Sequence, residues 1–256
     1  MKITHDLHTH TVYSSDTGRS ATFPLYIERA KKLGLTHLGF AEHFWDDSIE
    51  GAFPFYLPLT RRHMAEGRAE FEGYKDSDIK LYFGCEVEYD PVHHSPAITE
   101  ATAETFDFIL VPHSHSHETM PKEYYDDPKK HCDFLVEAYN DIINSSVSRY
   151  VTGMAHPFSL VRCPYPEKIL IDLVSDDTFK RMFDKTAEKG IAVEIRQRSD
   201  RPRGNGYPQS PAPKCLRPPH TRLRGRSAQV RHRGSFRFPP PKHLPPEAPP
   251  EAEVCP

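Results

Sequence analysis

Short apolar runs alternate with amphipathic stretches throughout residues 1–195, and this alternation limits the folds that the chain can adopt. The runs have the length of buried strands, whereas the stretches between them place apolar residues at helical spacing. Strands that alternate with helices form parallel sheets, because each helix returns the chain to the start of the next strand. We therefore predict an α/β fold with helices over residues 24–33, 56–74, 131–146 and 177–189 and strands over residues 3–7, 36–41, 79–87, 106–112, 150–155 and 191–195.

Residues 196–256 differ in composition from the rest of the chain. They hold 14 of the 25 prolines and 13 Lys and Arg against four Asp and Glu, so their formal charge is +9 whereas residues 1–195 carry −12. Only seven of these 61 residues are Leu, Ile, Val or Phe, too few to offset the entropy lost on ordering. We predict one folded domain over residues 1–195 and a disordered tail over residues 196–256. A basic tail can also contact nucleic acid non-specifically, although a solvated tail explains the same composition.

The cysteines argue against a disulfide framework and against a zinc ribbon. Their number is odd and no two are separated by two residues: Cys85, Cys132, Cys163, Cys215 and Cys255. No apolar run approaches the roughly 18 residues of a membrane span, and the polar start of the chain lacks the apolar stretch of a signal peptide. We therefore expect a protein of the reducing cytoplasm without a membrane partner.

Histidines and carboxylates gather where the predicted strands end. His8 and His10 close the first strand, and because side chains at i and i+2 of a strand point the same way, both imidazoles can reach one metal ion. The carboxyl ends of parallel strands meet at one edge of the sheet, so ligand-type residues of later strands should join this pair. These residues are His43, Glu86, His113, His115 and His156, with Asp16 in the loop after the first strand. A single such histidine is more often a surface group, but the joint pattern predicts a metal cluster.

The types of ligand limit which metals can bind here and which reactions they can support. Imidazole mixed with carboxylate, without an obvious thiolate, suits zinc, manganese or iron, and Cys85 should point away from Glu86 into the core. Several ions held close together suit hydrolysis of a phosphate ester, because one activates water and another binds the phosphate. Glu86 is the candidate bridging carboxylate, and we expect Glu86, His115 and His156 to carry catalysis.

Together these motifs resemble the polymerase and histidinol phosphatase family, known as the PHP domain, over residues 1–195. The resemblance rests on Asp6-Leu7-His8-Thr9-His10 with Asp16, Glu42-His43, Gly84-Cys85-Glu86, the cluster from His113 to His117, and Ala155-His156-Pro157. It implies a distorted TIM-like barrel of seven βα units, two to three divalent metal ions and phosphoesterase activity on a small phosphorylated substrate. As a stand-alone domain the chain is most similar to histidinol phosphatases, which implies histidinol phosphate, from histidine biosynthesis, as the substrate.

The resemblance also implies which residues bind metal: His8, His10, Asp16, His43, Glu86 and His156, of which the Asp16 position is often histidine in the family. The ligand after the fourth strand is ambiguous, because the spacing from Asp107 places the usual histidine near Ser114. His115 is the preferred match and His113 is the alternative. Alternation along a strand would place His113, His115 and His117 on one face, where one or two bind metal and the rest contact substrate.

The chain departs from the family after Ile195. The family's closing strand carries an Asp-x-His pair, whereas residues 196–256 contain no such pair and turn to Arg and Pro, as a shifted reading frame would. We therefore expect a barrel without its last strand and a reduced phosphatase activity.

Two other functions are compatible with the motifs. An amidohydrolase also opens with His-x-His, but it usually bridges its metals through a lysine on the fourth strand, and residues 106–112 contain none. A non-catalytic protein that binds metal weakly is the alternative from a different class. Phosphatase turnover with manganese or zinc separates an enzyme from such a protein.

Overall fold

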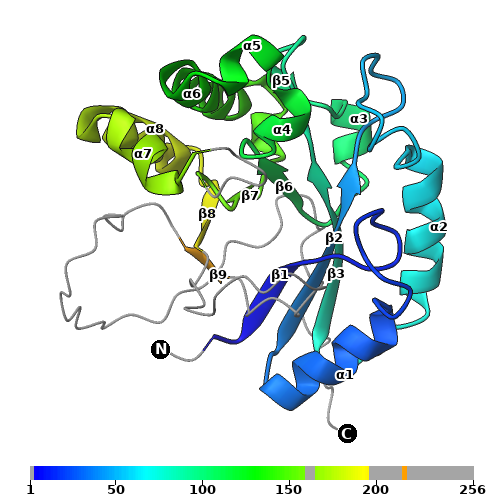
Figure 1. The fold of residues 1–256 in the computed structure, drawn as a ribbon. Coiled ribbons are helices and arrows are strands. Elements are labelled where there is room, and N and C mark those ends of the chain that lie inside the picture. Colours follow the sequence, from blue (N-terminus) through cyan, green and yellow to red (C-terminus); the bar gives the residue numbers. More distant parts are fainter. Residues whose placement is uncertain (1–2, 159–164, 196–214, 218–256) are drawn as a thin grey trace, which may run out of the picture.

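The chain forms a parallel sheet that curls into an open half-barrel (Figure 1). The computed structural model describes residues 3–158, 165–195 and 215–217. Six strands of this described part pair in parallel and in chain order: β1 (His5–Thr9), β2 (His37–Phe44), β3 (Lys80–Val87), β6 (Ile109–Pro112), β7 (Gly153–Ala155) and β8 (Ala192–Ile195). The predicted α/β class and the predicted parallel direction of the strands are confirmed.

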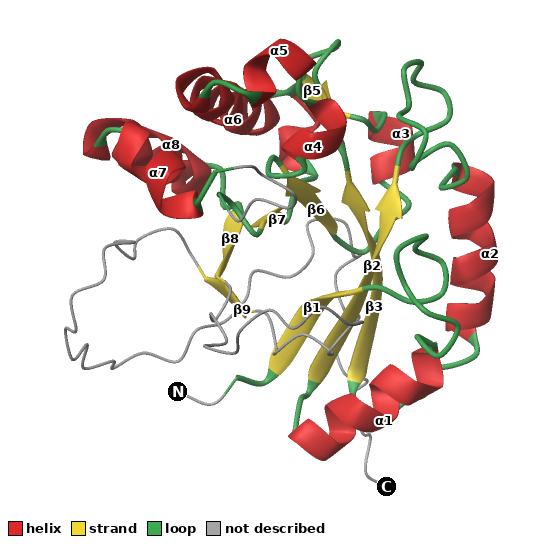
Figure 2. Cartoon of the chain, viewed as in Figure 1, coloured by secondary structure: helices red, strands yellow, loops and turns green. Residues whose placement is uncertain are grey.

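Helices lie along the outside of this curled sheet, as Figure 2 shows. Four of them correspond to the predicted helices: α1 (Phe23–Leu33), α2 (Arg61–Glu72), α6 (Pro128–Asn144) and α8 (Asp176–Glu188). The helix predicted to start at residue 56 starts at Arg61 instead, because Thr60 caps it by accepting a hydrogen bond from the His63 N–H. The sequence did not predict the shorter elements: β4 (Tyr89–Asp90), β5 (Ser95–Pro96), α3 (Glu100–Ala103), α4 (Ser116–Thr119), α5 (Lys122–Tyr125), the 3-10 helix η1 (Ser146–Arg149) and α7 (Glu167–Leu173).

One further strand, β9 (Cys215–Arg217), comes from the segment that was predicted to be disordered. It pairs antiparallel with β8, with Cys215 opposite Ile195 and Arg217 opposite Val193. The rest of that segment, residues 196–214 and 218–256, lies outside the described residues. The prediction that the chain lacks a closing strand with an Asp-x-His pair also falls on residues outside the described part of the chain.

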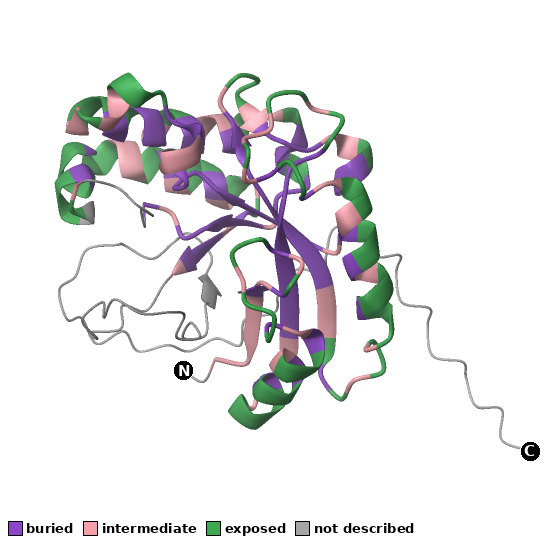
Figure 3. Ribbon diagram, turned by 45° about the vertical axis from the view of Figure 1, so that its right-hand side comes forward, coloured by how far each residue is buried: buried purple, intermediate pink, exposed green. Residues whose placement is uncertain are grey.

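The two faces of the sheet bury different side chains, because successive residues of a strand point to opposite sides. Outward positions such as Phe40, Phe83 and Cys85 join the large core beneath the helices. Inward positions form a smaller cluster: Ala41, Phe108, Leu110 and Ala155. The buried residues run along the strands at the centre of the molecule (Figure 3). Glu86 follows Cys85 and lies inward at the carboxyl end of β3, whereas Cys85 is buried on the other face, as predicted, and burial raises the pKa of its thiol.

Gly84 allows the interior of the half-barrel to accommodate Phe108. A Cβ atom at Gly84 would lie 2.5 Å from the Phe108 carbonyl oxygen and 2.6 Å from its ring. This oxygen accepts a hydrogen bond from the Cys85 N–H, so it cannot move without disturbing the contact between β3 and β6. We expect Gly84→Ala to lower the free energy of unfolding by about 1–3 kcal/mol, as measured by urea denaturation. Gly18→Ala, where a Cβ would meet open space, is the control, and equal stability of both variants would contradict this account.

Candidate metal centre

Glu86 lies at the centre of a buried histidine cluster at the carboxyl ends of the strands. Its Oε2 is 3.2 Å from His8 Nε2, 3.4 Å from His10 Nε2 and 3.2 Å from His43 Nδ1. Its Oε1 is 2.9 Å from His156 Nε2. The strand ends of β1, β2 and β3 and the turn after β7 therefore direct four imidazoles toward one carboxylate.

These donors fall into two triads that share Glu86. One contains His8, Glu86 and His156, the other contains His10, His43 and Glu86, and in each the ligand atoms lie within 4.8 Å of one another. The rings of each pair are stacked, with centroids 5.4 Å apart for His8 and His156 and 4.5 Å apart for His10 and His43. Two imidazole nitrogens and one carboxylate oxygen form a donor set that suits zinc and related divalent ions.

The electrostatics of the cluster also suit a divalent cation. Burial alone would raise the pKa of Glu86, but the imidazoles of His8 and His43 and a hydrogen bond with His156 hold it well below its usual range. Burial lowers the pKa of His156 to about 4, so its imidazole is neutral near neutral pH and offers a lone pair. Within the described part of the chain, the buried atoms Glu86 Oε2 and His43 Nδ1 have no hydrogen-bond partner. A bound metal ion would satisfy both, so these residues fit a metal.

Two further predicted ligands, Asp16 and His115, flank the triads. Asp16 Oδ2 is 3.5 Å from His43 Nε2, and this side chain is half exposed. The ring of His115 lies 5.1 Å from that of His156 and 5.7 Å from that of His43. Its Nδ1 is 2.9 Å from Glu88, which raises the pKa of His115 to about 9 although burial acts in the opposite direction.

His113 belongs to neither triad. Its ring packs against Tyr139 and Phe158, with centroid distances of 5.2 and 4.7 Å. The prediction that His113, His115 and His117 share one face is wrong, because β6 ends at Pro112 and strand alternation does not continue beyond it. Ser116–Thr119 instead form α4.

Three buried glutamates contact residues of the cluster. Glu42 belongs to the Glu42-His43 motif, but the sequence predicted a supporting role for none of the three. Glu194 accepts a hydrogen bond from His8, Glu88 pairs with His115, and Glu42 accepts hydrogen bonds from Thr11 and Ser14. Each is at most 2% exposed, which is rare for glutamate unless it is paired. For Glu88, which directly follows β3, the two-residue spacing from Glu86 was a signal that could have identified it.

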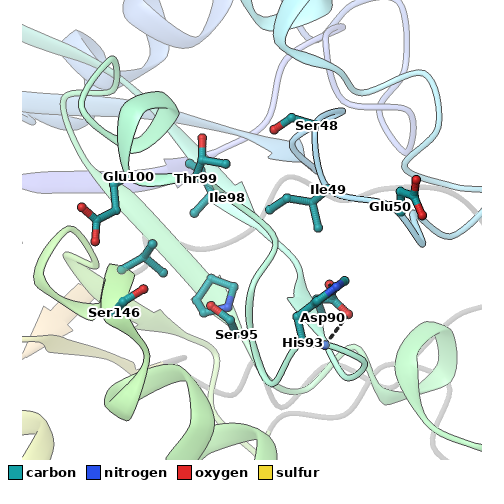
Figure 4. A pocket seen from close by; sticks show the side chains of 12 residues that line it. Ser48, Ile49, Glu50, Asp90, His93, Ser95, Ile98, Thr99, Glu100 and Ser146 are labelled. Carbon is teal, nitrogen blue, oxygen red and sulfur yellow. Dashed lines mark hydrogen bonds and ion pairs between the residues drawn. The ribbon is translucent and has the colours of Figure 1, made fainter.

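Two further features of the described structure lie outside this centre: a cluster of three ionisable side chains at the surface and a hollow. His94, Glu137 and Asp141 come together at the surface, where an ion pair of 2.8 Å between His94 and Asp141 accounts for their geometry. A hollow of about 650 Å³ lies beside the β4–β5 pair and η1, and Figure 4 shows side chains such as Asp90 and Glu100 around it. None of the predicted ligands lines this hollow.

The protein is thus an α/β protein in which the strand ends of a curled parallel sheet direct histidines toward one shared carboxylate. A sequence profile described as "PHP domain" matches residues 6–198. The chain therefore belongs to the PHP domain family.

Solved structures with the same fold include two from bacteria. The histidinol phosphate phosphatase of Lactococcus lactis subsp. lactis, complexed with zinc, L-histidinol and phosphate, is 20% identical with a TM-score of 0.52, and the match covers 74% of this chain and 72% of that one. A Listeria monocytogenes protein described as a histidinol phosphatase is 12% identical with a TM-score of 0.52, covering 74% and 80%. No curated protein sequence matches the chain. Among the described residues, no helix has the length and apolar character needed to cross a membrane.

Proposed function

We propose that this chain is a metal-dependent phosphoesterase that hydrolyses a small phosphate monoester, with histidinol phosphate as the first candidate substrate. The observation that carries the proposal is Glu86, whose carboxylate is shared by two histidine pairs in one buried cluster. Family membership and the fold shared with a zinc-bound histidinol phosphate phosphatase support the same activity. β6 contains no lysine, so the bridging group expected of an amidohydrolase is missing from that strand.

In this proposal each triad would hold one ion, and Glu86, which belongs to both triads, would contribute to both sites. Asp16 and His115 flank these positions as candidate ligands of a third ion. Divalent ions bound here would lower the pKa of water and neutralise charge on the phosphate. The chain itself orients the imidazoles, and the ring of Phe55 packs 5.3 Å from that of His43.

Phosphate release by the purified chain tests this function. With zinc, manganese or ferrous iron it should release phosphate from histidinol phosphate, and more slowly from p-nitrophenyl phosphate. Chelation with EDTA should reduce the release to background, and readdition of metal should restore it, because the chemistry depends on the bound ions. A chain that binds the ions but releases phosphate from neither ester would favour the non-catalytic alternative.

A further inference from the structure

Glu194, on β8, contacts both histidines of the first triad. Its Oε2 accepts a hydrogen bond from His8 Nδ1 at 2.7 Å and from the backbone N–H of His156 at 3.0 Å. Because a carboxylate only accepts hydrogen bonds, His8 carries a proton on Nδ1, so a metal ion held between this ring and Glu86 would bind Nε2, which lies 3.2 Å from Glu86 Oε2. His156 has a φ of 27°, which is strained for a residue with a side chain, so the bond to its N–H stabilises the turn that orients its ring.

Ser14, in the loop after β1, contacts both histidines of the second triad. Its hydroxyl donates to Glu42 Oε2 at 2.6 Å, accepts from the backbone N–H of His43 at 3.1 Å and lies 3.3 Å from His10 Nδ1. A hydroxyl has one proton and two lone pairs, so donation to Glu42 leaves one lone pair for each histidine. His10 is thereby set to carry its proton on Nδ1, with Nε2 directed toward Glu86.

The residues that contact the histidines of the first triad from outside it differ from those that contact the second. Glu194 acts from β8, at one end of the parallel strand order, whereas Ser14 and Glu42 act from the β1–α1 loop and β2 near the other end. Glu42 is itself held by the N–H and hydroxyl of Thr11. The two triads are therefore connected directly through Glu86 and are supported separately from behind.

We propose that Glu194 and Ser14 are positioning residues, each for one of two half-sites, so that the ion of one half-site can be lost while the other is retained. This inference rests on the proposed metal centre and concerns how the two ions are held. Partners of this kind, which orient a metal-binding imidazole, typically change metal affinity 10–100-fold.

The test measures zinc and cobalt affinity in backgrounds that retain one triad. In His43→Ala only the His8–His156 ion remains, and there Glu194→Gln should weaken binding roughly 10–100-fold while Ser14→Ala leaves it unchanged. In His156→Ala the remaining ion is held by His10 and His43. There Ser14→Ala should weaken binding roughly 10–100-fold, while Glu194→Gln leaves it unchanged. Asp46→Asn is the matched control, because it removes a buried carboxylate that is bonded to Ser48 and Thr99, away from both triads.

The outcomes distinguish this inference from the proposed function. Equal effects of both substitutions in both backgrounds would overturn separate support, whereas wild-type chain that binds no divalent ion would overturn the metal centre itself. Ion binding with the expected pattern but without phosphate release would refute only the phosphoesterase activity. If the double variants do not fold, the imidazole ¹⁵N spectrum of the metal-loaded wild-type chain decides, since His8 or His10 protonated on Nε2 would contradict the proposal.

Discussion

Replacing Glu86 by glutamine should remove both ions at once and abolish phosphate release. Glutamine has nearly the same shape, so the fold is retained, but it loses the charge that attracts two cations and cannot bridge them as a carboxylate does. The loss of turnover should exceed the 10–100-fold typical of residues that merely orient a ligand. Metal content of the purified variant, measured by elemental analysis, should fall far more than its melting temperature. Glu86→Ala should behave in the same way.

The matched control for this variant is Glu66→Gln. Glu66 is an exposed glutamate on α2 that pairs with Arg62 one turn away, an interaction of little energetic value. It should retain the metal content and turnover of the wild-type chain. A Glu86→Gln variant that keeps both ions would refute the idea that one carboxylate serves two half-sites.

The convergence of His8, His43 and Glu86 could be predicted from sequence because two simple rules determine it. Parallel strands bring their carboxyl ends to one edge, and strand alternation decides which of two neighbours, such as Cys85 and Glu86, points inward. Both rules can be applied to the sequence alone, because they need only the order of the strands and the position of each residue within its strand. The role of these residues as metal ligands remains a prediction.

The supporting residues could not be predicted, because their partners are distant in sequence. Glu194 contacts His8 across 186 positions, and nothing in the short run around it indicates which side chain it will meet. Ser14 depends on the path of an irregular loop, for which no periodicity exists. The prediction for the segment around His113 failed for a related reason, since the rule of alternation was applied beyond the last strand residue, Pro112.

The two histidines that the sequence left as alternatives have different surroundings. His115 lies beside both triads with Nδ1 held by Glu88, so a metal ion that displaces the proton on Nε2 would bind this nitrogen. His113 is buried between aromatic rings, and within the described part of the chain neither of its ring nitrogens has a hydrogen-bond partner. A buried polar group without a partner lowers stability, typically by about 1–3 kcal/mol.

We therefore expect opposite results when each of these histidines is replaced by phenylalanine. His115→Phe should lower turnover by more than roughly 100-fold and reduce metal content, because it removes a nitrogen beside both triads and leaves the buried Glu88 without one partner. His113→Phe should keep the ions and the turnover, because an aromatic ring of similar shape still packs against Tyr139 and Phe158. Its free energy of unfolding should stay the same or rise, as measured by urea denaturation. Loss of metal from His113→Phe together with full metal content in His115→Phe would reverse the assignment and make His113 the ligand that follows β6.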